Sequence, residues 1–252
     1  MSTPTQDTLR GFIAAPDALA GKTILVTGAS DGIGKAVAMA AAKAGALVIM
    51  MGRTQRKLEV AHDEIVAAGA AAPVIVPVDF MKAEGSVYLA LAEQINEDFG
   101  QLDGLVHCAG MLGEMTDIEQ YDAAVWQQVM HVNMTAVFAL TKVCIPAIKT
   151  AKGSIVFASS SVGRRGRAFW GAYSVSKFAV EGFAQTLADE LSAAGVRVNT
   201  VNPGATKTAM RLKAYPAEDR SALRTPDEIA PACLYFLCDE QDGPTGLSVD
   251  AQ

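Results

Sequence analysis

The sequence predicts an α/β fold in which a doubly wound parallel sheet of about seven strands is covered by helices on both faces. Short apolar runs alternate along the chain with longer segments of helical periodicity. The runs are apolar throughout, as expected for parallel strands that are buried on both faces. A glycine-rich turn joins the first run to the next helical segment, which is typical of sheets that bind a ligand beyond their carboxyl ends.

The predicted elements follow from this alternation. The strands are 23–26, 47–51, 74–78, 104–108, 154–158, 196–201 and 247–249. The helices are 33–44, 54–68, 82–99, 121–150 with a break, 172–194 and 226–238. Polar residues and glycines follow the strands, so the predicted ligand crevice lies at that edge of the sheet.

Composition limits the class of protein. Half of the 252 residues are hydrophobic, 19% are charged and the formal net charge is -6. We therefore expect one large α/β domain over 1–252, with 1–20 as an N-terminal extension, and no basic surface that would recruit nucleic acid. The four cysteines and three histidines lack metal-ligand spacing, which predicts buried thiols and no metal site. With no signal-like or long apolar segment, the expected location is cytoplasmic, without a membrane.

The octapeptide TGASDGIG, at 27–34, is the first candidate binding element. It lies between a predicted strand and a predicted helix, so its glycines allow a tight turn and a close approach of a ligand. The first N–H groups of the helix and the helix dipole favour an anion such as a diphosphate. The predicted cofactor-binding residues here are Gly28, Ser30, Asp31, Gly32, Ile33 and Gly34.

A tyrosine and a lysine form the second candidate element. Tyr173 and Lys177 are four residues apart in a predicted helix, so they share one face. A nearby ammonium stabilises a phenolate and lowers the pKa of the phenol, which suits Tyr173 to exchange a proton with a carbonyl or alcohol oxygen. The same spacing also occurs on solvated helix faces. Ser159-Ser160-Ser161 follows a predicted central strand and adds a hydroxyl at the same edge.

Together with Asn-Pro-Gly at 202–204, these motifs resemble the short-chain dehydrogenase/reductase family, from Lys22 to Asp250. The resemblance implies a Rossmann-like fold and hydride transfer with a nicotinamide cofactor. It implies that Ser160 holds the substrate carbonyl, that Tyr173 is the general acid/base, and that Lys177 lowers its pKa and binds the nicotinamide ribose. Asn133, in His-Val-Asn-Met, matches the family asparagine that supports a proton relay through water, although an asparagine inside a helix is more often simply solvated.

The resemblance also implies further cofactor contacts. Asp79 and Phe80 would flank the adenine, and Ala109 and Gly110 would pass close to the adenosine half. The nicotinamide and diphosphate would be contacted by Pro203, Gly204, Thr206 and Thr208. The chain departs from the family at His107-Cys108, which replaces the usual Asn-Asn and loses its amide side chains. A buried cysteine and a non-titrating histidine are the favoured interpretation there.

Within the family, the chain resembles the bacterial YciK-type oxidoreductases, a branch whose substrate is not settled. The matching segments are 159–173 (SSSVGRRGRAFWGAY), 209–211, 225–229 and the last five residues, SVDAQ.

NADP(H) is the expected cofactor, favoured over NAD(H). An NAD site places an acid about twenty residues after the glycines to bind the ribose 2′-OH. Here the second strand ends at Gly52-Arg53-Thr54, and the guanidinium of Arg53 suits a 2′-phosphate. The alternative is an arginine that faces water. Asp31 counts against the phosphate, because its charge would oppose that of the phosphate.

These observations predict an oxidoreductase that reduces a carbonyl to an alcohol, or the reverse, and a homodimer or homotetramer built through the two long helices. The alternative is a non-catalytic NADP-binding interaction or sensor protein on the same fold. The cluster of Arg164, Arg165 and Arg167 either attracts an anionic substrate or carrier protein, or faces solvent or a subunit. The apolar cleft walls suit a hydrophobic substrate and are expected from Met111, Leu112, Phe169, Trp170, Met210 and Tyr215.

Overall fold

The computed structural model describes residues 4–238 and 243–252, and residues 1–3 of the expected extension lie outside it. Its centre is a seven-stranded parallel sheet in the order β3-β2-β1-β4-β5-β6-β7. The strands are β1 (Thr23–Thr27), β2 (Leu47–Gly52), β3 (Val74–Pro77), β4 (Gly104–His107), β5 (Ser154–Ala158), β6 (Arg197–Asn202) and β7 (Ser248–Asp250). The predicted doubly wound sheet is confirmed, and each strand lies within a residue or two of its predicted range.

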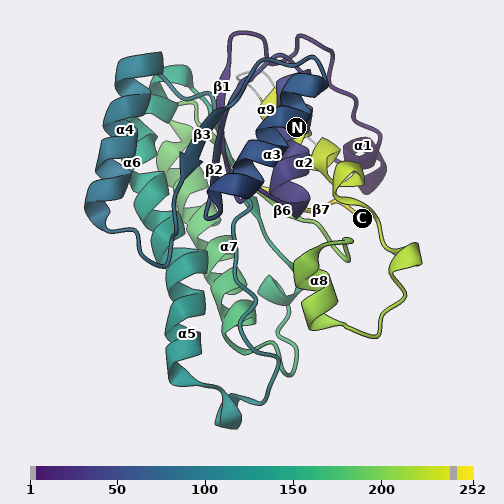
Figure 1. Cartoon of the computed structure of the whole chain (residues 1–252). Coiled ribbons are helices and arrows are strands. Elements are labelled where there is room, and N and C mark those ends of the chain that lie inside the picture. Colours follow the sequence, from purple (N-terminus) through teal and green to yellow (C-terminus); the bar gives the residue numbers. More distant parts are fainter. Residues whose placement is uncertain (1–3, 239–242) are drawn as a thin grey trace.

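Helices cover both faces of the sheet (Figure 1). One face carries α1 (Gln6–Arg10), α2 (Gly32–Lys43), α3 (Gln55–Ala67) and α9 (Ala230–Cys238). The other carries α4 (Gly85–Phe99), α6 (Ala136–Ala151) and α7 (Gly171–Ser192). Successive strand residues therefore enter different cores: in β5, Val156 packs on the first face, whereas Ile155 and Phe157 pack on the second.

The expected break in helix 121–150 is a change of helix type. The segment comprises α5 (Ala123–Met130), a π-helical turn (His131–Thr135) and α6. The Ala136 N–H donates to the His131 carbonyl across that turn, so the backbone hydrogen bonding continues. By length and composition, Ala123–Ala151 could cross a membrane, but Leu140, Cys144 and Ile148 pack against the sheet as in a core helix.

The other differences are local. The edge strand β3 is partly exposed, because only one neighbour covers it. The predicted helix 82–99 begins at Gly85, and the predicted helix 226–238 is a 3-10 turn (Pro226–Glu228) followed by α9. Two short helices were not predicted, α1 and α8 (Ala209–Ala214).

The N-terminal segment is docked on the domain. Leu9 and Leu19 are fully buried in the same core as α2 and α9, and the rings of Phe12 and Tyr235 meet edge to face at 5.5 Å. The Leu19 N–H also donates to the Ala44 carbonyl. The described part of the expected extension therefore closes one end of the core.

Candidate functional site

A cleft of about 680 Å³ opens at the carboxyl ends of β1, β4, β5 and β6. Its lining brings together most of the predicted site residues. These are Gly28, Asp31, Gly32, Ile33, Gly34, Ala109, Gly110, Ser160, Tyr173, Lys177, Pro203, Gly204, Thr206 and Thr208. Ser30, Arg53, Asp79, Phe80 and Asn133 lie outside that lining.

The glycine-rich turn is held close to the next strand. Gly28 has φ +67°, and a Cβ there would lie 2.8 Å from the backbone nitrogen of Ala109. A Cβ on Gly34 would lie 2.4 Å from the carbonyl oxygen of Gly28. Both positions exclude a side chain, which leaves the N-terminus of α2 open toward the cleft.

Asp31 caps that helix. Its carboxylate accepts from the Gly32 N–H at 2.8 Å and pairs with the Lys57 ammonium at 2.9 Å. The hydrogen bond from Lys57 is the largest cause that lowers the pKa of Asp31, and burial opposes it. The negative charge that counted against a phosphate is therefore paired with a lysine on α3.

Thr27 holds the backbone of the turn that follows β4. Its hydroxyl accepts from the N–H groups of Cys108 and Ala109, both at 3.1 Å.

His107 is buried and stacks on Phe157, with ring centroids 5.0 Å apart. It shares a 2.9 Å hydrogen bond with the Thr141 hydroxyl. Burial and the nearby Lys177 lower the pKa of His107 to about 3, so the ring is neutral. Burial also raises the pKa of Cys108 to about 12. Both residues fit the favoured core interpretation.

Tyr173 and Lys177 lie together on α7, facing the end of β5. Both side chains are buried, and the Lys177 ammonium lies 5.6 Å from the centroid of the Tyr173 ring. Burial raises the pKa of Tyr173 to about 12, and a hydrogen bond with Ser160 opposes the rise. Of the three consecutive serines, Ser160 lines the cleft with Tyr173, while the Ser159 hydroxyl donates to Glu181.

The role of Lys177 in lowering the pKa of the phenol stays a prediction. The Lys177 ammonium donates to the Ala158 carbonyl at 2.6 Å instead of to the tyrosine. Burial lowers the pKa of Lys177 to about 8, with Cys108 and Glu181 opposing the change. Burial is therefore the largest cause of both pKa shifts, and it favours the neutral form of each group.

Asn133 lies on the π-helical turn and is buried. Its side-chain oxygen accepts from the Met111 N–H at 2.7 Å, and its amide nitrogen donates to the Met111 carbonyl at 2.9 Å and to the Ser176 hydroxyl at 3.0 Å. The side chain thus ties the segment after β4 to α7. A relay through Asn133 stays a prediction.

Four predicted cofactor contacts lie outside the lining of the cleft. Arg53 is exposed just after β2, and Ser30 lies beside Gly52 at the same strand end. Asp79 accepts from the Met81 N–H within its own turn, and the Phe80 ring packs in the core beside Tyr88, with centroids 6.3 Å apart. Their roles in binding the cofactor stay predictions.

Apolar side chains form one wall of the cleft. Leu112, Val162, Trp170 and Tyr173 form a buried cluster, against which Met210 and Tyr215 pack. Two expected wall residues are absent from the described lining. Met111 is held by Asn133, and Phe169 is 53% exposed in a strained backbone with φ +71°.

The three arginines of the loop before α7 have separate positions. Arg164 turns inward and pairs with Glu181 and Asp250, at 3.1 and 2.7 Å. Arg165 is exposed, and Arg167 lines the cleft. Arg164 therefore fits neither of the two alternatives, an anion-binding cluster or a loop that faces solvent or a subunit, because its guanidinium is paired inside the protein.

Several site residues escaped the sequence analysis. Thr27, Lys57, Arg211 and Gln252 hold or line the cleft; Gln252 donates to the Pro203 carbonyl, and Arg211 pairs with Glu218. Glu181 was detectable, since it follows Lys177 by the same four residues that separate Lys177 from Tyr173.

Comparison with known proteins agrees with this geometry. The sequence pattern of the short chain dehydrogenase family matches residues 22–219. The Escherichia coli K12 oxidoreductase YciK is 45% identical over 237 residues, covering 94% of each chain. A 3-oxoacyl-[acyl-carrier-protein] reductase of Thermotoga maritima is 32% identical, covering 90% of this chain and 95% of the reductase.

Solved structures are similar along nearly the whole chain. A Shigella flexneri short chain dehydrogenase complexed with NADP superimposes with a TM-score of 0.91 at 43% identity, covering 94% of this chain and 99% of the other. An Escherichia coli CFT073 homologue complexed with NADPH gives a TM-score of 0.91 at 44% identity, with the same coverage.

Proposed function

The chain belongs to the short-chain dehydrogenase family of oxidoreductases, and on that premise we propose that it reduces a carbonyl to an alcohol, or runs the reverse, with NADP(H). One observation carries the proposal. Tyr173, whose side chain is buried, and Ser160 both line the cleft that the glycine-rich turn borders. A non-catalytic NADP-binding protein would not require that pair, so we favour the enzyme.

The residues present fit the cofactor. Gly28 and Gly34 leave a cradle that a Cβ would fill, and the N-terminus of α2 borders the cleft, where the helix dipole favours a diphosphate. We assign the diphosphate to the 28–34 turn and the nicotinamide half to Lys177 and the 203–208 loop. Two similar structures are complexed with NADP or NADPH, which supports the choice of cofactor.

Arg53 and Lys57 favour the phosphorylated cofactor. Arg53 lies exposed beside the end of β2, and Ser30 reaches the same strand end from the glycine-rich turn. A planar guanidinium binds phosphate through paired, charge-assisted hydrogen bonds. Lys57 neutralises Asp31, which removes the repulsion that the sequence suggested.

In the proposed reaction, each chain residue has a separate task. Ser160 donates to the substrate carbonyl oxygen and positions it, and Tyr173 donates the proton that this oxygen needs as it becomes an alcohol. NADPH, when bound, supplies the hydride. Lys177 places a positive charge beside the phenol, and the apolar wall excludes water from the reacting atoms.

The wall also suggests the substrate class. Leu112, Trp170, Met210 and Tyr215 present apolar surface beside Tyr173, which suits a hydrophobic ketone or alcohol.

A cytoplasmic location and a single domain over 1–252 belong to the same proposal. Cell fractionation tests the location, and limited proteolysis of the purified chain tests the single domain.

Exposed apolar side chains on two long helices support a homodimer or homotetramer. Val175 and Phe178 on α7 are 43% and 44% exposed, and Phe138 on α6 is 46% exposed. A second copy would cover these side chains through an isologous contact. Light scattering at micromolar concentration should give at least twice the 26.3 kDa chain mass. A measured particle mass equal to that of a single chain would contradict the proposal.

Replacing Arg53 tests the choice of cofactor. Arg53→Asp should weaken NADPH binding by at least about tenfold while NADH binding stays within about threefold, because a charge-assisted phosphate contact is lost. Fluorescence titration measures both affinities. Arg56→Asp makes the same charge change at another exposed position nearby and should change neither. Equal losses in the two variants would leave Arg53 without a specific role.

Tyr173→Phe tests the proton donor. The substitution keeps the ring, so NADPH should bind with nearly unchanged affinity while turnover of a carbonyl substrate falls by about a hundredfold or more. A panel of carbonyls and alcohols, followed by NADPH absorbance, supplies the assay. Tyr88→Phe removes a buried hydroxyl that makes no hydrogen bond within the described residues, and should retain activity. Near-normal turnover by Tyr173→Phe would move the acid to another residue.

A further inference from the structure

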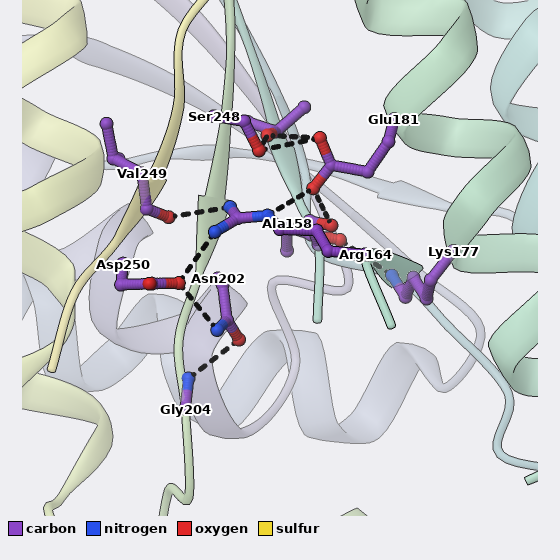
Figure 2. Close-up of polar contacts among 11 residues, drawn as sticks. Ala158, Arg164, Lys177, Glu181, Asn202, Gly204, Ser248, Val249 and Asp250 are labelled. Carbon is purple, nitrogen blue, oxygen red and sulfur yellow. Dashed lines mark hydrogen bonds and ion pairs between the residues drawn. The ribbon is translucent and has the colours of Figure 1, made fainter. Parts of the chain in front are cut away.

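Behind the cleft, Glu181 is the centre of a polar network (Figure 2). This side chain is buried one helical turn beyond Lys177 on α7. One carboxylate oxygen accepts from the Ser159 hydroxyl and from Arg164 Nε at 3.1 Å. The other accepts from the hydroxyls of Thr200 and Ser248, at 2.9 and 2.7 Å. Burial would raise the pKa of Glu181, but these four hydrogen bonds outweigh it and leave the pKa lowered, so the group is ionised.

Arg164 connects that carboxylate to the last strand of the sheet. Besides Glu181, its guanidinium donates to the Asp250 carboxylate at 2.7 Å and to the Val249 carbonyl at 2.9 Å. These contacts use three different guanidinium nitrogens on three acceptors. Only the planar fork of arginine can hold acceptors in such an arrangement, because a lysine offers a single point charge.

From Asp250 the network returns to the cleft. The same Asp250 oxygen accepts from the Asn202 side-chain amide at 2.8 Å, and the Asn202 side-chain oxygen accepts from the Gly204 N–H at 3.1 Å. Gly204 lines the cleft and has φ +67°, so its peptide is held in a conformation that few other residues adopt. Figure 2 shows this line of contacts from Arg164 to Gly204.

The other branch reaches the proton-transfer residues. Ser159, which Glu181 holds, immediately precedes Ser160. Lys177 lies on the same helix as Glu181 and is bound to the Ala158 carbonyl at the end of β5. A single guanidinium thus connects the Ser160 side of the cleft, through Glu181, with the Gly204 side, through Asp250.

We propose that Arg164 is a positioning residue for hydride transfer: it fixes the carbonyl-binding side of the cleft relative to the loop at 202–204. The inference rests on the proposed reductase function and adds to it a residue that touches neither substrate nor cofactor. Reacting atoms must be aligned closely, and a displacement of about 1 Å costs up to about a hundredfold in rate. Loss of Arg164 therefore lowers kcat, whereas the apolar wall that binds the substrate is unchanged.

The test compares Arg164→Gln with Arg165→Gln in the full-length protein. Arg165 is the exposed neighbour and serves as the matched control. With NADPH and the best carbonyl from the panel, Arg164→Gln should lower kcat by about tenfold or more and leave KM for the carbonyl within about twofold. Arg165→Gln should match the unaltered protein. Arg164→Lys should recover only part of kcat, because it restores the charge and not the fork.

Amide hydrogen exchange gives a readout that needs no turnover. In Arg164→Gln, exchange at Ser160 and at Gly204 should rise together, whereas Arg165→Gln should leave both unchanged. Asp250→Ala keeps the Arg164–Glu181 pair and removes the link to Asn202, so exchange should rise at Gly204 alone. If Arg164→Gln does not fold, exchange at Gly204 in Asp250→Ala tests whether the network holds the loop at 202–204.

The outcomes separate the two proposals. Failure of the unaltered protein to reduce any carbonyl overturns the proposed function, and the exchange data still show whether Arg164 holds both sides of the cleft. If the unaltered protein is active and Arg164→Gln equals Arg165→Gln in kcat and in exchange, the positioning role is wrong. A lowered melting temperature in Arg164→Gln with unchanged kcat would likewise make Arg164 merely structural and overturn the inference.

Discussion

The cleft depends on the burial of a polar helix face. Tyr173, Lys177 and Glu181 follow one another at four-residue spacing along α7, and all three side chains are buried against the ends of β5 and β6. Charged groups are costly to bury unless each has a partner. The Ala158 carbonyl serves Lys177, and four donors serve Glu181. These same contacts join α7 to β5 and β6, so the packing of α7 and the geometry of the site have one origin.

The loop before α7 completes that arrangement. A Cβ on Gly163 would lie 2.7 Å from the Cβ of Lys177, so only glycine lets the loop lie directly on the helix. Ser174 then donates to the Val162 carbonyl at 2.6 Å. With the loop held there, Ser160 faces the cleft and Arg164 turns inward. Val162 and Trp170 of the apolar wall lie on this loop, so the wall also depends on the packing of the loop against α7.

Much of this could be predicted from the sequence, because the signals are local. Apolar runs that end at glycine, serine or Asn-Pro mark the strands, and helical periodicity brings Tyr173 and Lys177 to one face. Parallel strands then carry Ser160 and Gly204 to the same edge of the sheet. The resemblance to the dehydrogenase family assigned roles to these residues, and the comparisons confirmed the family.

What the sequence did not reveal depends on contacts between distant segments. Arg164 was grouped with Arg165 and Arg167, because nothing local indicates that its partners are Glu181 and Asp250. Lys57 lies 26 residues from Asp31, so the ion pair that neutralises the turn was also missed. Leu9 and Leu19 are isolated apolar residues in a polar segment, and their burial depends on a surface formed by α2 and α9.

The pH dependence of kcat/KM for NADPH tests the central claim, that Lys177 acts as a buried cation beside a neutral Tyr173. This ratio reports the ionisation of groups in the free enzyme.

Burial lowers the pKa of Lys177 to about 8. The titratable groups facing it are Tyr173 and Glu181 on its own helix and His107 and Cys108 beside the end of β4. Because Tyr173 has a pKa of about 12, it stays protonated while Lys177 loses its charge. Reduction should therefore fall as the pH rises through about 8, and Lys177→Met should lack that limb. A profile that is flat or rising through that range would contradict the account.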